Sequence, residues 1–356
     1  MIASRETGRI SVRTTVPGEG AAIAALWREL WDALEAWGGY PGSRDPAVYA
    51  ELGRLLDANA RERAGHPVHG RHVHLVADVG GTPCGQVEGW IERHGVDPET
   101  PLTCEVRSLI VTERARGLGV GRILLRALAA SARIVANGSP CVLAAEVLEP
   151  NPALQFYERL GYGVIGHSAR VEAARGERMA LDWPRCPVAR VALSSDAPAI
   201  ARLDRMLAAR RRAAGDVRFD VARAPNSEAT ATGTVLTPSE AAATADAAAG
   251  MPTNPAVLLA LDDCGVVRGG AFFVVQTLEP PFLPMRRAFV GRFAVDPVWA
   301  VEPTMIALVA LACRLALIEG APYVEVADLP QPGAELHEAA LAAGAAPWCR
   351  TLARVA

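Results

Sequence analysis

A short glycine-rich stretch between an apolar run and an amphipathic one constrains the fold most. Glycines at positions 117, 119 and 121 follow the run LTCEVRSLIV and precede ILLRALAASAR. The apolar run predicts a strand, and apolar residues at helical spacing after the glycines predict a helix. Glycines at a helix start leave its free backbone N–H groups open to a ligand, because no Cβ blocks the approach. The stretch therefore predicts a helix N-terminus that binds an anion.

Arginines stand on both sides of these glycines and add positive charge to the predicted anion site. The spacing is Arg116-x-x-Gly119-x-Gly121, followed by Arg122. A dinucleotide fingerprint is not met, because the third glycine comes one residue too early. A phosphate loop with its lysine is also absent, since the chain contains no lysine at all. Neither of these two phosphate-binding motifs explains the stretch.

The composition indicates a globular chain of two domains. A length of 356 residues exceeds what one core comfortably supports, and a net charge of -3 gives no bulk positive charge for nucleic acid or an anionic membrane. The longest apolar run, MIALVALACRLALIEG, contains Arg314 and Glu319, and the N-terminus lacks an apolar signal core. We expect a cytoplasmic protein that does not enter a membrane. Seven scattered cysteines, none in a C-x-x-C pair, argue against a disulfide framework or a zinc ribbon.

Hydrophobic periodicity predicts an α/β (α+β) fold with a mixed central sheet and helices on both of its faces. The expected order is βααβββαβαββ, and the last two strands form a hairpin. The predicted strands lie near residues 8–17, 71–79, 84–93, 102–111, 141–147, 162–167 and 177–183, and the helices lie near 18–40, 45–65, after 121 and near 152–161.

A second stretch, about thirty residues further on, carries an equally specific pattern. EPNPALQFYERLGY, residues 149–162, has an asparagine, an aromatic–tyrosine pair and a Leu-Gly-aromatic end. Together with the glycine stretch and the order of elements, it resembles the Gcn5-related N-acetyltransferase (GNAT) family over residues 9–183. The resemblance implies acetyl-CoA as co-substrate and an amine as acceptor.

The resemblance also implies which residues hold coenzyme A. The backbone of Leu109, Ile110 and Val111 would pair with the pantetheine arm. Asn151 would reach the pantetheine amide, and Tyr157 would protonate the departing thiolate. The pyrophosphate would be held by Arg116, Gly117, Leu118, Gly119, Val120, Gly121 and Arg122.

Direct transfer of an acyl group from sulfur to an amine needs proton-handling groups but no metal and no covalent nucleophile. Glu105, eleven residues before Arg116, matches the position of a general-base glutamate in some family members. A half-exposed surface carboxylate is the competing explanation. Tyr157 has a competing explanation too, as an ordinary aromatic on a buried helix face beside Phe156 and Leu160.

The acceptor side is less defined. In the family the first two helices and the last hairpin frame the acceptor, and a small cationic amine with some apolar bulk would suit the residues found there. Core packing explains the tryptophans among them equally well. Acetylation of a protein or peptide amine is an alternative, and a non-catalytic acyl-CoA sensor or scaffold is another. The candidate acceptor residues are Trp37, Tyr40, Glu88, Glu92 and His167, with Trp31 and Tyr49 nearby.

A cluster of histidines and a run of arginines are not expected to belong to the functional site. Histidines at positions 66, 69, 72 and 74 have no carboxylate or cysteine among them, so we expect no metal site. His72 and His74 are expected on one face of a strand. The run Arg210 to Arg212 is expected to be a solvated helix end, where cations suit the helix dipole.

The second half repeats the pattern of the first. Aligning Val111 with Val295 without gaps sets Ala300, Pro303 and Met305 opposite Arg116, Gly119 and Gly121. Pro303 has no N–H to donate, and Met305 is expected to fill the space of a phosphate. Tyr157 falls opposite Ala340.

We therefore expect tandem domains, an intact copy over 1–186 and a degenerate copy over 187–356. The chain would bind one coenzyme A and act as a monomeric pseudo-dimer or a homodimer. Residues 226–250 are expected to form a mobile loop with one Ala-rich helix after Thr237.

Overall fold

The computed structural model describes residues 10–65, 72–93, 101–181, 183, 186–219, 256–278 and 280–356. The predicted loop and helix at 226–250 lie outside these residues. In the first half the elements are β1 (Ile10–Thr14), α1 (Gly20–Leu26), α2 (Trp31–Ala36), α3 (Pro46–Gly65), β2 (His72–Val79), β3 (Thr82–Arg93), β4 (Leu102–Val111), α4 (Val120–Ala136), β5 (Cys141–Leu148), α5 (Ala153–Arg159), β6 (Gly163–Glu172) and α6 (Ala173–Leu181).

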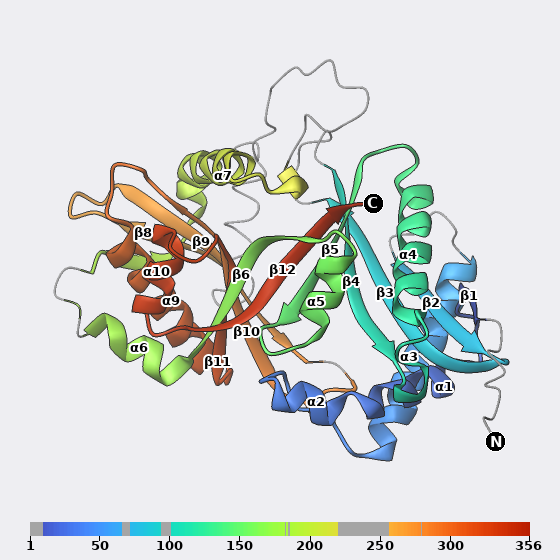
Figure 1. Cartoon of the computed structure of the whole chain (residues 1–356). Helices are drawn as coiled ribbons and strands as arrows, with labels where there is room; N and C mark the ends of the chain where they lie inside the picture. The colour runs from blue at the N-terminus through green and yellow to red at the C-terminus, as the bar shows by residue number, and fades with distance from the viewer. Residues whose placement is uncertain are drawn as a thin grey trace.

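In the second half they are β7 (Val188–Val191), α7 (Ala197–Ala213), the short 3₁₀ helix η5 (Val217–Phe219), β8 (Ala256–Leu261), β9 (Val267–Thr277), β10 (Arg286–Val295), α9 (Val301–Ile318), β11 (Tyr323–Leu329), α10 (Glu335–Ala342) and β12 (Ala346–Val355). Among the described residues, these strands form one twelve-stranded sheet in the order β1-β2-β3-β4-β5-β12-β6-β11-β10-β9-β8-β7 (Figure 1).

The two halves interleave at the centre of this sheet. The last strand, β12, pairs antiparallel with β5 on one side, from Cys349–Leu148 to Val355–Val142, and with β6 on the other. In turn β6 pairs antiparallel with β11 of the second half. Figure 1 shows the red β12 running between the green strands of the first half. Each half thus completes its sheet with a strand of the other.

The predicted final hairpin is wrong in its second strand. Residues 173–181 form helix α6. Ala, Arg, Glu, Met and Leu in this segment favour a helix, and Gly176 lets α6 approach α9 so closely that a Cβ there would lie 2.4 Å from Cys313 Sγ. The sheet position expected for residues 177–183 is taken by β12. The predicted helix over 18–40 is also divided, because a 3₁₀ turn at Trp27–Glu29 separates α1 from α2.

The sheet has two differently covered faces. On the face that we call the α4 face, α4 and α5 pack on strands of the first half around Leu143 and Leu352, and α9 and α10 pack on strands of the second half. On the opposite face, called the α7 face, α1 and α3 cover one end and α7 covers the other. Helix α9 is long and apolar enough to cross a membrane, but it is a core helix whose Met305, Ile306 and Leu308 are fully buried.

An aromatic contact joins the halves a second time on the α7 face. Phe282 packs with ring centroids 6.0 Å from Trp27 and 5.4 Å from Trp31. Trp31 is fully buried, and its indole N–H donates to the Tyr49 hydroxyl. Trp31 and Tyr49 therefore belong to the core.

Candidate active site

The site begins where β4 and β5 part. These parallel strands pair from Leu102–Cys141 to Val106–Ala145 and no further. A bulge opens β4 just beyond, where Ser108 adopts a φ of 52° and the register against β3 shifts. Ile110 and Val111 still pair with β3 at their other edge. The predicted pantetheine strand, Leu109 to Val111, thus runs along the gap without a strand partner at its β5-facing edge, where Val111 O accepts a hydrogen bond from Arg116 Nε at 3.3 Å.

The glycine loop closes one end of this gap. Gly117 and Gly119 both have a φ of 81°, a left-handed conformation that favours glycine. A Cβ at Gly117 would meet nothing within 4 Å, and one at Gly121 would lie 3.2 Å from the ring of Phe156. Gly119 caps α4 without a side-chain hydrogen bond. Among the hydrogen bonds of the described residues, none uses the N–H groups of Gly119 to Arg122.

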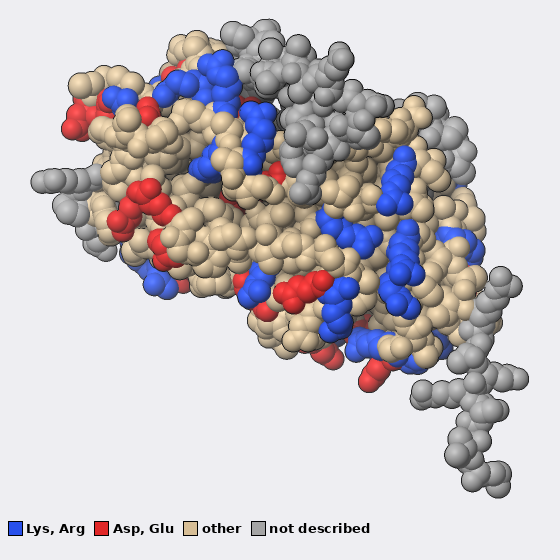
Figure 2. Space-filling model, turned by 45° about the horizontal axis from the view of Figure 1, so that its top comes forward, with Lys and Arg blue, Asp and Glu red and all other residues tan. Residues whose placement is uncertain are grey.

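Arginines surround that helix start. Arg116, Leu118 and Arg122 are exposed, and the exposed Arg126 and Arg133 continue the row along α4. Figure 2 shows basic side chains in a row on the side of the molecule where α4 lies. Arg114 and Arg116 also line an open depression of about 610 Å³, together with Glu29 and Glu113. Free N–H donors, the helix dipole and guanidinium groups together fit a diphosphate.

Tyr157 and Asn151 lie on the α4 face beside the gap. Tyr157 is 5% exposed and packs edge-on to Tyr162, and burial raises the pKa of its phenol. The phenol is therefore protonated at neutral pH, as a proton donor to a thiolate must be. Asn151 Oδ1 accepts a hydrogen bond at 2.9 Å from the N–H of Ala153, the first residue of α5. The amide nitrogen of Asn151 is available for the predicted contact to pantetheine.

Glu105 lies on the opposite, α7 face. It pairs across the strands with Trp90 of β3 and Ala144 of β5, one residue before the last β4–β5 pair. Its carboxylate forms an ion pair of 2.5 Å with Arg107, and both side chains meet solvent. Arg107 therefore competes with any amine for this carboxylate.

A second carboxylate, Glu146 on β5, was not identified from the sequence. It lies beside Glu105, where β4 and β5 part. It lies two residues beyond Ala144 on the α7 face, level with the parting of the strands. The side chain is exposed, yet enough protein surrounds it that burial raises the pKa of its carboxyl. Ser168 Oγ donates to it at 3.4 Å, and no ion pair among the described residues includes it. A polar residue inside the apolar run CVLAAEV was the available signal.

The predicted acceptor residues are not gathered at one point. Tyr40 is buried, and its hydroxyl donates to Glu325 of the second half. His167 lies on the α4 face, where Nε2 is 3.1 Å from Gln331 Oε1 and Nδ1 is 3.7 Å from Glu149. Glu88 and Glu92 lie on β3, whereas the half-buried Trp37 ends α2. Of these residues, Tyr40, Glu88 and Glu92 share the α7 face with Glu105 and Glu146.

The histidine cluster is only partly described, because His66 and His69 lie outside the described residues. His72 and His74 share one face of β2, as predicted, and each lies 3.8 Å from a Glu88 oxygen. These imidazoles help to keep the pKa of Glu88 below its usual value despite its burial. Within the described part of the chain, no group of three or more His, Cys, Asp or Glu is placed to hold a metal ion.

In the second half the equivalent gap is closed by arginines. Strand β10 carries the same bulge, at Arg292 with a φ of 56°, which stands opposite Ser108 when Val111 is aligned with Val295. Arg210 donates to the carbonyl of Phe293 at 2.6 Å, and Arg211 donates to the carbonyl of Asp328 at 2.5 Å. Phe293 is the counterpart of Leu109, so a guanidinium occupies backbone that the first half leaves open.

This corrects the prediction of a solvated helix end at Arg210 to Arg212. Arg211 is 5% exposed and pairs with Asp216 and Asp328, and only Arg212 is exposed. Burial, together with the neighbouring Arg211, lowers the pKa of Arg210 to about 10. Arg210 and Arg211 can be buried because carboxylates and backbone carbonyls of the gap replace the hydrogen bonds of their hydration water.

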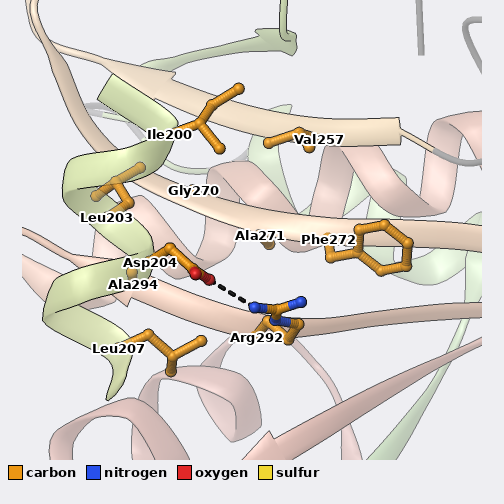
Figure 3. Close-up of a pocket in the computed structure, with 10 residues that line it drawn as sticks. All are labelled: Ile200, Leu203, Asp204, Leu207, Val257, Gly270, Ala271, Phe272, Arg292 and Ala294. Carbon is orange, nitrogen blue, oxygen red and sulfur yellow. Dashed lines mark hydrogen bonds and ion pairs between the residues drawn. The ribbon is translucent and has the colours of Figure 1, made fainter. Parts of the chain in front are cut away.

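The glycine loop has no counterpart either. Helix α9 begins at Val301, so its first turn occupies the positions of Gly117 and Gly119 and includes Pro303. Met305 was predicted to fill the space of a phosphate. Instead it is fully buried in the core of the second half. What remains near the bulge is a largely apolar cavity of about 220 Å³ between α7 and the sheet, where Asp204 and Arg292 form an ion pair of 2.5 Å (Figure 3).

Comparisons with known proteins agree with this arrangement. Residues 70–164 match the family model described as "Acetyltransferase (GNAT) domain". A GCN5-related N-acetyltransferase from Sphaerobacter thermophilus is 16% identical with a TM-score of 0.56, and the match covers 97% of this chain and 95% of that one. A tandem GNAT protein from the clavulanic acid biosynthesis pathway is 16% identical with a TM-score of 0.50, covering 98% of both chains. A search of curated proteins found no match.

The solved structures establish the fold at these identities, and the family model establishes the domain that carries the glycine loop. GNAT acetyltransferases use acetyl-CoA, which supplies the acetyl thioester. The open gap, the free helix N-terminus and the arginines of the first half fit that donor. The chain thus contains an acetyltransferase domain of the GNAT family at residues 70–164, within the fold of a tandem GNAT protein.

Proposed function

We propose that this chain is a cytoplasmic acetyl-CoA-dependent N-acetyltransferase that acts on the amine of a small molecule. One donor site lies in residues 1–186, and residues 187–356 are a degenerate copy. The supporting observation is the placement of proton-handling groups on opposite sides of the β4–β5 gap. Glu105 and Glu146 lie on the α7 face, whereas Tyr157 lies on the α4 face.

This placement suits direct transfer of an acetyl group. A thioester in the gap presents its carbonyl to an amine that arrives from the α7 face, and its sulfur lies toward α5. A carboxylate on the amine side removes a proton, and the Tyr157 phenol returns one to the departing thiolate. The unpaired backbone edge at Leu109 to Val111 supplies donors for the polarised carbonyl oxygen.

Of the two carboxylates, Glu146 is the better base. Glu105 already has Arg107 as its cation, whereas no cation lies within ion-pair distance of Glu146 among the described residues. A base is most effective when its pKa approaches the working pH, and burial raises that of Glu146. When ionised, a carboxylate without a cationic partner also favours a cationic amine as acceptor.

The test is a coenzyme A release assay with purified full-length protein and a panel of amines, including amino acids, polyamines, amino sugars and a lysine peptide. We expect turnover with a small amine, lost in Glu146→Gln and retained in Glu105→Gln. Turnover with the peptide alone would favour a protein acetyltransferase. Tight acetyl-CoA binding without turnover across the panel would make the chain an acyl-CoA sensor and refute the proposal.

A further inference from the structure

The second half contributes charged groups to the face on which Glu146 lies. On β11, Glu325 is 1% exposed and accepts from the Tyr40 hydroxyl and from Arg287 Nη2, the latter at 2.5 Å. Arg287 is on β10, and the pairing of Phe289 with Glu325 puts these strands in register. Both members of this ion pair come from the half whose own donor site is closed.

The interleaved strands bring this pair close to the site. Ser168 of β6 donates to Glu146, and Arg170, two residues further along the same face of β6, pairs with Glu325. Two residues of a strand span about 7 Å, so the two carboxylates lie on the order of 10 Å apart. Charges that protein partly encloses interact over that distance with little screening by salt.

The two members of the pair act on Glu146 in opposite senses. Arg287 opposes the rise in the pKa of the Glu146 carboxyl, and Glu325 adds to it. Glu146 in turn helps to raise the pKa of Arg287. Other charged or titratable groups act in the same region: Glu105 on β4, Arg170 on β6, Asp328 on β11, Cys349 on β12 and Arg218 on η5.

We propose that Arg287 and Glu325 of the second half tune the electrostatic potential at Glu146 in opposite directions, so that the degenerate half is a working part of the acetylation site. This rests on the proposed function, in which Glu146 accepts the amine proton. Arg287 and Glu325 touch neither substrate in this account, so they are positioning residues that act through the potential. The retained sheet of the second half then has a catalytic consequence although it binds no donor.

The ion pair makes the proposal testable by two variants with opposite effects. Arg287→Gln removes a positive charge and is expected to raise the titration midpoint of Glu146 by about half a pH unit at this distance. Glu325→Gln removes a negative charge, keeps one of the two acceptor oxygens, and is expected to lower the midpoint by a similar amount. A merely structural role would not shift the midpoint in opposite directions.

The midpoint is read without any acceptor, by carboxyl ¹³C NMR of full-length protein labelled at the glutamate side-chain carboxyl. Loss of a signal in Glu146→Gln assigns the resonance. Matched controls are Arg286→Gln and Glu319→Gln, because Arg286 neighbours Arg287 on β10 and pairs with Glu319 at 2.6 Å. Both controls should leave the midpoint unchanged. If Arg287→Gln does not fold, Glu325→Gln decides alone.

Unchanged midpoints, or shifts in the same direction for both variants, would overturn the proposal. With an amine from the panel, the acidic limb of kcat/KM should move with the NMR midpoint, toward higher pH in Arg287→Gln and lower pH in Glu325→Gln. Full activity in Glu146→Gln would refute the role of Glu146 while leaving the NMR result standing. The electrostatic effect of Arg287 and Glu325 and the role of Glu146 as a base can therefore be refuted independently.

Discussion

Leu352 provides a direct test of the strand exchange. It lies in the last strand of the chain, is fully buried, and packs in the core of the first half with Leu143 and Val147. Leu352→Ala removes a buried side chain and leaves a cavity, a change that costs roughly 2–5 kcal/mol. Because β5 and β6 hold Leu352 on both sides, the surroundings collapse little, and we expect about 3 kcal/mol.

The assay is urea unfolding of the full-length protein, followed by circular dichroism and, in parallel, by acetyl-CoA binding. With an m value of about 3 kcal/mol per molar, the loss should lower the midpoint by about 1 M urea. Acetyl-CoA binding should be lost at the same lowered midpoint, because the residue stabilises the half that carries the donor site. A matched control is Ile318→Ala, since Ile318 is 68% exposed in the second half.

The control should leave both midpoints unchanged. If Leu352→Ala lowers the midpoint by circular dichroism while acetyl-CoA binding persists to the wild-type urea concentration, the halves unfold independently. An unaltered midpoint by both methods would refute the packing of β12 in the first half. Either result would remove the physical basis for a shared sheet.

Three further predictions follow from the same contacts. Tyr157→Phe should lower kcat about a hundredfold with acetyl-CoA affinity unchanged, and Tyr162→Phe is its control; a loss below tenfold would mean that solvent supplies the proton. Glu146→Gln should raise the melting temperature above pH 7 but not below pH 4. A carboxyl whose pKa rises on folding is most stabilising when protonated, and it loses that contribution as pH rises through its folded pKa. If the variant and the wild type melt at the same temperature at both pH values, the raised pKa is contradicted. A fragment of residues 1–186 should self-associate, because the edges of β5 and β6 that pair with β12 would be exposed; a soluble monomer would contradict this.

Much of the first half was predictable because its signals are local. Gly117 and Gly119 were predicted to precede a helix, and α4 begins directly after them, at Val120. Periodicity located the strands through β6 for the same reason, although β6 extends to Glu172, beyond the predicted 162–167. Local patterns of turn residues and apolar spacing are set by neighbours in the chain, which the sequence displays.

The strand exchange was not predictable from such signals. APWCRTLARV, residues 346–355, is paired with β5 and β6, some 200 residues away, and no local pattern names those partners. The helical propensity of residues 173–181 was available, but the expectation of a closing hairpin within the first half outweighed it. Pairing between segments distant in the sequence determined the structure of both residues 173–181 and residues 346–355.

The sequence predicted only those site residues that belong to recognisable motifs. Spacing pointed to Glu105, but whether a carboxylate is already paired depends on the side chain of Arg107, which the sequence does not place. Glu146 gained significance only when the parting of β4 and β5 was seen beside it. Similarly, Arg210 and Arg211 read as a charged helix end until the structure placed them on the backbone of the closed gap.

The central claim is that one donor site exists, at the glycine loop of the first half. Isothermal titration of the full-length protein with acetyl-CoA tests it most directly, alongside Gly121→Glu, which puts a carboxylate at the start of α4, and Pro303→Ala in the second half. We predict one acetyl-CoA per chain, lost in Gly121→Glu and retained in Pro303→Ala. Two molecules per chain, or unaltered affinity in Gly121→Glu, would contradict the account.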